Sequence, residues 1–206
     1  ALILNGLNSL EEISDKRMEE LKVYSEISKD FVFQEDKVFN AISEIMMGQG
    51  FSGVTVEAVA NKLGLAKSSM YTYFSNKNAM LKQLSLNEIS NLINCVQKNI
   101  KHGKNFSESI YIQLITEFNY LLKRESFLPV FVWLGSQGAF SDKDLIGDEI
   151  DFNLSVEFQD EKLLRGWTSV LCVALLTQGK KNKYTKEEFD NSIKKIYSLM
   201  SNGLKL

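Results

Sequence analysis

Apolar residues along this chain recur at intervals of three and four positions, and strict alternation of apolar and polar residues is scarce. Intervals of three and four place side chains on one face of an α-helix, whereas alternation would indicate a half-buried β-strand. The single proline, Pro129, stands where the first turn of a helix tolerates it. The pattern therefore predicts an all-α protein.

Several polar residues are candidate helix caps. Ser9 with Glu12 reads as a capping box opening a first helix, whose apolar positions are Leu10, Ile13, Leu21 and Tyr24. Ser107 is the predicted N-cap of a helix in the middle of the chain. Thr185 with Glu188 forms a second capping box and opens the last helix.

The stretch "TVEAVANKLGLAKSSMYTYF" predicts two short helices joined by a turn. Thr55 caps the first helix, and Gly64 follows its last turn, where a left-handed conformation is needed that glycine adopts without strain. The buried face of this helix is predicted to contain Val56, Val59, Ala60 and Leu63. Two short helices with a glycine in the turn are typical of a helix-turn-helix.

The second of these helices is predicted from about Lys67 to Phe74, with Met70 and Phe74 pointing inward and Leu65 filling the turn. In a helix-turn-helix the beginning of the second helix meets base edges in the major groove of DNA. Small hydroxyls can donate or accept there, and a lysine can reach guanine or a phosphate. No carboxylate interrupts the sequence from Lys62 to Lys82, which predicts a locally positive surface.

Residues 38–81 also resemble the DNA-binding domain of the TetR family of transcriptional regulators. The resemblance is carried by Gly50 with Phe51, Thr55, the Ala60 and Gly64 pair, and the run "MYTYFSNK". Ala66 departs from the family, where Ser or Thr often caps the recognition helix, and Asn78 replaces a frequent Glu. The resemblance implies a set of DNA contacts, namely Thr55, Lys67, Ser68, Ser69, Tyr71, Tyr73 and Lys77. The alternative is a packed helical hairpin without a DNA role.

The resemblance further implies that the chain after about Ile89 is a helical regulatory domain that binds a small molecule and forms a homodimer. Dimerisation would use the last two helices, near residues 160–179 and 186–203. The predicted interface residues are Leu164, Trp167, Leu171, Leu175, Ile193, Ile196 and Met200. Such apolar stripes fit an intramolecular core equally well. The predicted domains are an N-terminal helical extension (1–33), the helix-turn-helix domain (34–82) and the regulatory domain (83–206).

Aromatic residues crowd the middle of the chain and are candidates for an apolar ligand pocket. The candidate ligand-binding residues are Phe118, Leu122, Phe131 and Trp133. Ordinary core packing is the alternative for each of them. The sequence does not separate Lys123, Arg124 and Glu125 from solvated surface residues.

Composition and the motifs that the sequence lacks argue against several classes of function. The 206 residues carry a net charge of -2 with a pI near 5.6, which argues against indiscriminate coating of nucleic acid. Cys95 and Cys172 read as core residues of a reducing, cytoplasmic compartment, and no segment reads as a membrane span or secretory signal. One histidine, His102, gives no metal-ligand cluster, and no cofactor is expected. Common hydrolase, metalloprotease and phosphate-binding motifs are missing from the sequence, which disfavours an enzyme.

The resemblance thus implies a repressor that a small, largely apolar ligand releases from a near-palindromic operator. The alternative is a DNA-binding regulator whose C-terminal domain answers to a protein partner. The segment "EEISDKRMEELK" has mixed charges. It reads as an extra helix packed on the domain or its dimer mate, or as a segment that reaches DNA or a partner.

Overall fold

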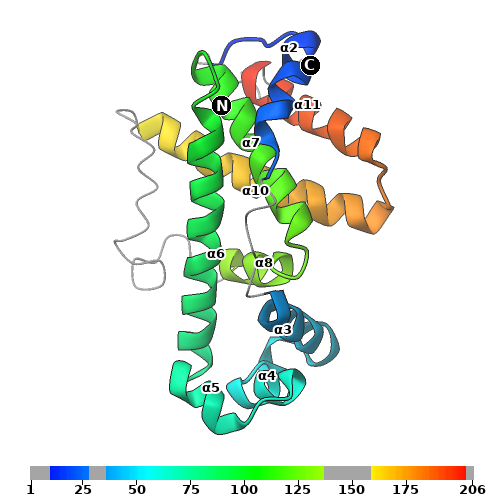
Figure 1. The fold of residues 1–206 in the computed structure, drawn as a ribbon. Coiled ribbons are helices and arrows are strands. Elements are labelled where there is room, and N and C mark those ends of the chain that lie inside the picture. Colours follow the sequence, from blue (N-terminus) through cyan, green and yellow to red (C-terminus); the bar gives the residue numbers. More distant parts are fainter. Residues whose placement is uncertain (1–9, 28–35, 137–158, 203–206) are drawn as a thin grey trace. The chain divides into compact units, whose positions relative to one another are not determined.

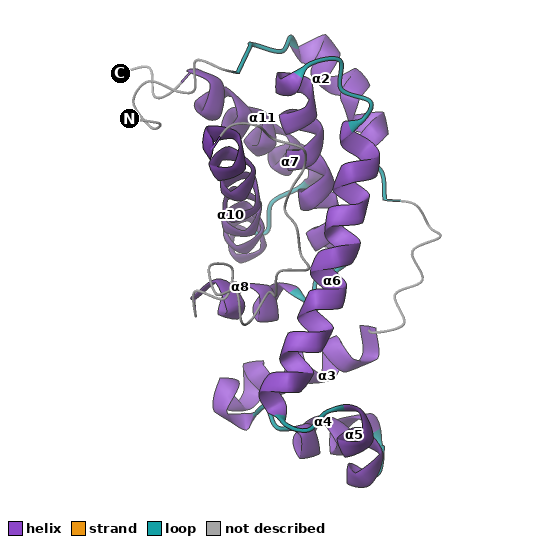
Figure 2. Ribbon diagram, turned by 90° about the vertical axis from the view of Figure 1, so that its left-hand side faces the viewer, coloured by secondary structure: helices purple, strands orange, loops and turns teal. Residues whose placement is uncertain are grey.

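The computed structural model describes residues 10–27, 36–136 and 159–202. This described part consists of helices joined by loops and turns, without a β-strand, as Figure 2 shows. The all-α prediction is therefore confirmed. None of the helices in these ranges is both long enough and apolar enough to cross a membrane.

The chain folds into two compact units. The helix-turn-helix unit takes in residues 29–92 and 123–151, and the terminal unit takes in residues 1–28, 93–122 and 152–206. Helix α6 (Lys77–Ile100) contributes to both. The domain boundaries predicted at residues 33 and 82 stay predictions. The compact units group the chain differently, because a segment after residue 122 joins the helix-turn-helix.

The helix-turn-helix unit is built around three consecutive helices, which Figure 1 shows in dark blue to cyan. Helix α3 packs on α4, α4 packs on α5, and α3 also contacts α8. Apolar side chains from these helices and from α6 form its core, including Phe39, Ile42, Val59, Ala60 and Met80, each fully buried. The elements in chain order are α3 (Asp36–Gln49), the 3-10 turn η2 (Phe51–Gly53), α4 (Val56–Leu63), α5 (Lys67–Tyr73) and α8 (Leu128–Ser136).

A buried ion pair crosses this core. Arg124 and Glu88 are both fully buried, and the guanidinium donates two hydrogen bonds to the carboxylate, one of them 2.8 Å from Nη2 to Oε2. The guanidinium also lies 5.8 Å from the centre of the Phe39 ring. Phe39 in turn makes an edge contact with Phe127. Arg124 is thus a core residue, while its neighbours Lys123 and Glu125 are exposed.

The terminal unit is built on α7, whose residues are buried over most of its length. The two last helices begin and end close to the predicted positions, and the Thr185–Glu188 capping box is present. Thr185 N–H donates to Glu188 over 2.7 Å, and Glu188 N–H donates to the Thr185 hydroxyl over 3.2 Å. Cys95 and Cys172 are free and buried, as predicted. The elements of the unit are α2 (Asp15–Lys22), η1 (Val23–Ser25), α7 (Phe106–Lys123), α10 (Gln159–Asn182) and α11 (Lys186–Asn202).

Two predicted caps are wrong. Helix α2 begins at Asp15, where the Ser14 hydroxyl accepts from Arg17 N–H, so Glu12 lies outside it. Helix α7 takes its cap from Asn105, whose side chain accepts from Glu108 N–H over 2.9 Å. The Ser107 hydroxyl instead accepts from Glu11 N–H over 2.7 Å. A tertiary contact between the segment before α2 and the start of α7 therefore takes the Ser107 hydroxyl out of its predicted capping role, while Ser9 lies outside the described residues.

Helix α2 is held on the terminal unit by ion pairs to α7 and α11. Arg17 donates to both carboxylate oxygens of Glu108, at 2.8 and 3.0 Å. Lys22 pairs with Asp190 at 3.0 Å, and Lys194 of α11 pairs with Glu19 at 2.9 Å. Figure 1 shows α2 beside α7 and α11. The extra helix predicted from the first 33 residues thus exists and packs within its own chain.

Acid should loosen this attachment. The hydrogen bond from Arg17 holds the pKa of Glu108 below its ordinary value, and that from Lys194 does the same for Glu19. A depressed folded-state pKa gives stability that is present above the ordinary pKa of glutamate, roughly 4.3, and is lost as the pH falls through the lower folded value. We expect the amide exchange of α2, corrected for its intrinsic pH dependence, to accelerate as the pH drops below that range.

Arg17→Ala should accelerate the exchange of α2 already at neutral pH, since it removes the paired hydrogen bonds to Glu108. Lys16→Ala is the matched control, because it removes the same charge from an exposed position of the same helix. Equal exchange in both variants would mean that the Arg17 pair does not hold α2.

Candidate nucleic-acid interface

Helix α4 has the ends that its sequence predicts. The Thr55 hydroxyl accepts from Ala58 N–H over 3.0 Å, while Thr55 itself is extended. At the other end Gly64 has φ 68° and ψ 25°, in the left-handed region, and its N–H donates to carbonyls of the last turn. A side chain at this position would be strained by the backbone. These two residues fix where α4 stops and how the chain turns toward α5.

Helix α5 packs on α4 through Met70, which is 4% exposed. Its N-cap residue, Ala66, makes no side-chain capping bond, as its replacement of Ser or Thr predicted. Phe74 is half-buried, but Leu65 is 48% exposed, so the prediction that Leu65 fills the turn is wrong. The turn instead closes through backbone hydrogen bonds, among them Leu65 N–H to Ala60 C=O at 2.9 Å.

The outer face of α5 consists of polar and aromatic side chains open to solvent. Tyr73 is 75% exposed and Tyr71 44% exposed, although both are large aromatic residues. Lys67, Ser68 and Ser69 at the start of the helix are exposed as well. The fold thus brings five predicted DNA contacts onto one short helix, and Thr55 lies exposed at the start of the neighbouring α4. Hydroxyl and ammonium groups on an exposed helix of this motif suit both base edges and phosphates.

The prediction of an uninterrupted positive surface needs correction, because the fold supplies carboxylates from other helices. Glu44 of α3 pairs with Lys62, and Glu57 of α4 pairs with Lys67 at 2.7 Å. The Glu57 pair raises the pKa of Lys67. Sequence reasoning passed over Glu57, ten positions before Lys67. Glu57 could have been found from its position in the first turn of α4, because this helix belongs to the same helix-turn-helix motif as α5.

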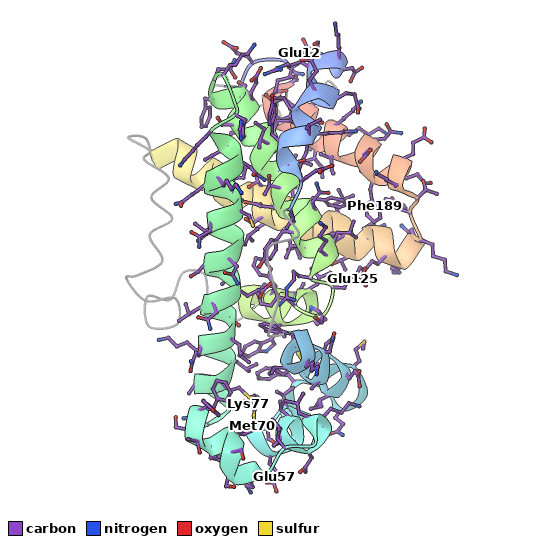
Figure 3. All side chains as sticks on the ribbon, viewed as in Figure 1. Glu12, Glu57, Met70, Lys77, Glu125 and Phe189 are labelled. Atoms are coloured by element: carbon purple, nitrogen blue, oxygen red, sulfur yellow. The ribbon has the colours of Figure 1, made fainter. Side chains whose placement is uncertain are left out.

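Lys77 is engaged within the unit. Its ammonium donates to the Phe51 carbonyl over 2.6 Å and lies 3.6 Å from the centre of the Phe51 ring. The Phe51 ring also stacks on Trp133 of α8, with centroids 3.7 Å apart. Burial lowers the pKa of Lys77. The Lys77 ammonium therefore links the start of α6 to the turn that follows α3. Figure 3 labels Lys77 at this place.

This geometry separates two roles of Lys77 by experiment. We expect Lys77→Met to destabilise the helix-turn-helix unit by about 1–2 kcal/mol, since it removes a hydrogen bond from a charged group and a cation–π contact. DNA affinity should fall through this loss of positioning, with the slope of log affinity against log salt unchanged. A phosphate contact would instead lower that slope by about one. Anisotropy titrations at several salt concentrations measure the slope, with Lys37→Met as a charge-matched control. A reduced slope in Lys77→Met alone would instead support the predicted contact of Lys77 with a phosphate.

Comparison with known proteins agrees with this geometry. The model of bacterial regulatory proteins of the tetR family matches residues 38–84, which run from α3 into α6. This match is to a family of bacterial regulatory proteins and covers the helix-turn-helix that the structure shows. The IcaR protein of Staphylococcus aureus, a negative transcriptional regulator of the biofilm operon icaADBC, is 23% identical over 159 residues, 77% of each chain.

Solved structures of two bacterial regulators share the fold. The fatty acid degradation regulator FadR of Bacillus halodurans superposes with a TM-score of 0.58 at 15% identity, over 86% of this chain and 99% of that one. FadR of Bacillus subtilis, solved in complex with stearoyl-CoA, gives a TM-score of 0.52 at 16% identity, over 82% and 98%. At these identities the likeness concerns the fold.

The four predicted ligand residues fall into both units. Phe118 and Leu122 belong to the terminal unit, where Phe118 is buried against Phe189 and Leu122 is 36% exposed. In the helix-turn-helix unit Phe131 makes an edge contact with Phe127, and Trp133 stacks on Phe51. Packing within each unit accounts for three of them without a ligand, and the pocket remains a prediction.

The predicted dimer residues divide by burial. Leu175, Ile193 and Met200 are buried within the single chain, where the core alternative accounts for them. Leu171 and Ile196 are partly exposed. The side chains of Leu164 and Trp167 lie outside the described residues. Among the predicted interface residues on α10 and α11 whose side chains the structure describes, Leu171 and Ile196 are therefore the ones that a second copy could cover.

Proposed function

We propose that this chain is a transcriptional repressor that binds a near-palindromic operator as a homodimer and is released by a small, largely apolar effector. The observation that carries the DNA part is α5, which packs through Met70 and leaves Ser69, Tyr71 and Tyr73 open. We assign its exposed side chains and Thr55 to the DNA contact. Lys77 supports them from within the unit.

Repression is supported by the likeness to IcaR, which is a negative transcriptional regulator. An apolar effector is supported by the FadR structure from Bacillus subtilis, which holds stearoyl-CoA. An effector that binds a DNA-incompetent conformation more tightly would shift the population off the operator.

A homodimer is supported by the partly exposed apolar residues of the last two helices. Leu171 and Ile196 are partly exposed, and Val170 of α10 is 58% exposed. A two-fold dimer presents two copies of α5 to DNA, which requires two half-sites related by the same symmetry. Sedimentation velocity of Val170→Glu against the wild type tests this interface. A wild type that sediments as a monomer would remove the dimer from the proposal.

The decisive experiment for the function measures fluorescence anisotropy on DNA from upstream of the protein's own gene at fixed physiological salt. Unrelated DNA is present in excess as competitor. We expect binding that survives the competitor, because specific binding exceeds non-specific binding by several orders of magnitude, typically 10³–10⁷-fold. Complete competition would leave only the electrostatic contribution and would count against this operator.

The effector is tested on the same complex by titration with stearoyl-CoA, using free coenzyme A as the matched control. Release by stearoyl-CoA alone supports an apolar effector. If neither compound releases the DNA, a cell extract is tested for release. An extract that releases the DNA, but no longer does so after protease treatment, indicates that a protein partner controls the regulator.

A further inference from the structure

The ion pair between Lys67 and Glu57 joins the two helices of the DNA-binding motif at their exposed side. Lys67 is the first residue of α5, and Glu57 lies in the first turn of α4. Their side chains meet at 2.7 Å while remaining 52% and 54% exposed. Figure 3 shows Glu57 at the outer edge of the α4 and α5 pair. The pair therefore presents an ammonium and a carboxylate side by side to whatever binds this face.

Stability does not explain this arrangement. Ion pairs between exposed side chains contribute little, because water screens the charges and ordering two long side chains costs entropy. The unit contains a comparable exposed pair, Lys62 with Glu44, which links α3 to α4 and involves no residue of α5. The two pairs share chemistry and exposure, and only one of them includes a residue of the recognition helix.

A carboxylate on a DNA-binding face is normally unfavourable, because phosphates repel it. It is favourable where DNA offers a donor, and in the major groove the amino group at N4 of cytosine is the donor that glutamate accepts from. Lysine donates to O6 and N7 of guanine. A G·C base pair carries these groups on the same edge, acceptors from guanine next to the donor from cytosine. The neighbouring charges of Lys67 and Glu57 match that order.

An A·T base pair matches the pair less well. Its edge also carries acceptors at adenine N7 and thymine O4, but its donor at adenine N6 lies between them, and the thymine methyl group at the end of the edge favours an apolar partner. Two opposite charges would then lose water against a methyl group without full compensation. We therefore expect the pair to favour G·C over A·T.

We propose that Lys67 and Glu57 read one G·C base pair of each operator half-site as a unit, which makes Glu57 a specificity-determining residue. This inference rests on the proposed function, since it requires the motif to dock α5 in the major groove. Glu57 orients the Lys67 ammonium and also accepts from cytosine. Loss of either side chain therefore affects the same base pair.

The variants have distinct expected effects. Glu57→Gln keeps the shape but gives an amide, which also pairs with adenine, so preference for G·C at that position should fall by roughly tenfold. Lys67→Met should lose the same preference. Glu57→Ala leaves Lys67 without its intramolecular carboxylate, so binding to unrelated DNA should strengthen and its salt dependence should steepen.

The test selects bound sequences from a library in which an operator half-site is randomised, using the full-length protein and sequencing the bound fraction. Wild type, Glu57→Gln and Lys67→Met are compared with the control variants Glu44→Gln and Lys62→Met. We expect one G·C position to lose its preference in both test variants and to persist in both controls. Circular dichroism melting confirms that all variants are folded.

Three other outcomes would overturn this inference. A wild type that enriches a sequence, with both test variants enriching the same sequence unchanged, overturns this inference and leaves the proposed function standing. If Glu57→Gln and Lys67→Met lose preference at two different positions, the two side chains contact DNA independently. That result also overturns the inference that they recognise one base pair together. A wild type that enriches nothing overturns the proposed function and this inference together.

Discussion

Arg124→Met should lower the free energy of unfolding of the helix-turn-helix unit by about 3–5 kcal/mol. The substitution leaves the Glu88 carboxylate in a fully buried site without the guanidinium that donates two hydrogen bonds to it. Removing one partner of a buried ion pair costs several kcal/mol, which is much more than the pair itself gains over apolar side chains. Urea unfolding followed by circular dichroism measures the loss. Thermal melting should show it as a fall of roughly 6–20 °C.

The double variant Arg124→Met with Glu88→Leu is the control for this argument. It removes both charges and keeps apolar volume, so most of the lost stability should return. Glu125→Gln, at the exposed neighbouring position, should change stability little. If the double variant is as unstable as the single one, packing and not the buried charge accounts for the loss.

Ser69→Asp should weaken operator binding by about two orders of magnitude without unfolding the protein. Ser69 is exposed near the start of α5, and an added carboxylate there meets base acceptors and phosphates instead of donors. A lost base contact alone costs roughly 1–3 kcal/mol, and repulsion between like charges adds to it. Anisotropy on the operator fragment measures the affinity, and the melting temperature should stay within a few degrees of the wild type.

Ser198→Asp is the matched control for Ser69→Asp. It adds the same charge at an exposed position of α11 in the terminal unit, so it tests the effect of net charge on DNA binding. We expect near wild-type affinity for it. Equal weakening in both variants would contradict the assignment of α5 as the recognition helix.

Features set by the local backbone could be predicted from the sequence. Thr55 and Gly64 act within a few residues of their own position, one by capping and the other by taking a left-handed conformation. The Thr185–Glu188 box is equally local and is present. Helix type and approximate bounds follow from the same short-range rules, which is why the all-α fold and the last two helices were predictable.

Features decided by tertiary contact were not predictable. Ser107 and Asn105 are both good caps, and the choice between them depends on a contact of Ser107 with Glu11, ninety-six positions away. Arg124 stands among charged residues at a helix end, where the sequence does not separate it from surface residues, yet its partner Glu88 lies on α6. The site shows the same limit, because the position of Glu57 in the first turn of α4 is readable from the sequence but its contact with Lys67 on the next helix is not.

The paired lysines of the motif have a kinetic consequence. Lys62 and Lys67 are each matched by a carboxylate, and the Lys77 ammonium faces Phe51. Weak attraction to an arbitrary stretch of phosphates means short dwell times on it, since each neutralised phosphate adds to non-specific affinity. Such a protein would search a chromosome mainly by repeated encounters from solution, with little sliding, and would leave wrong sites quickly.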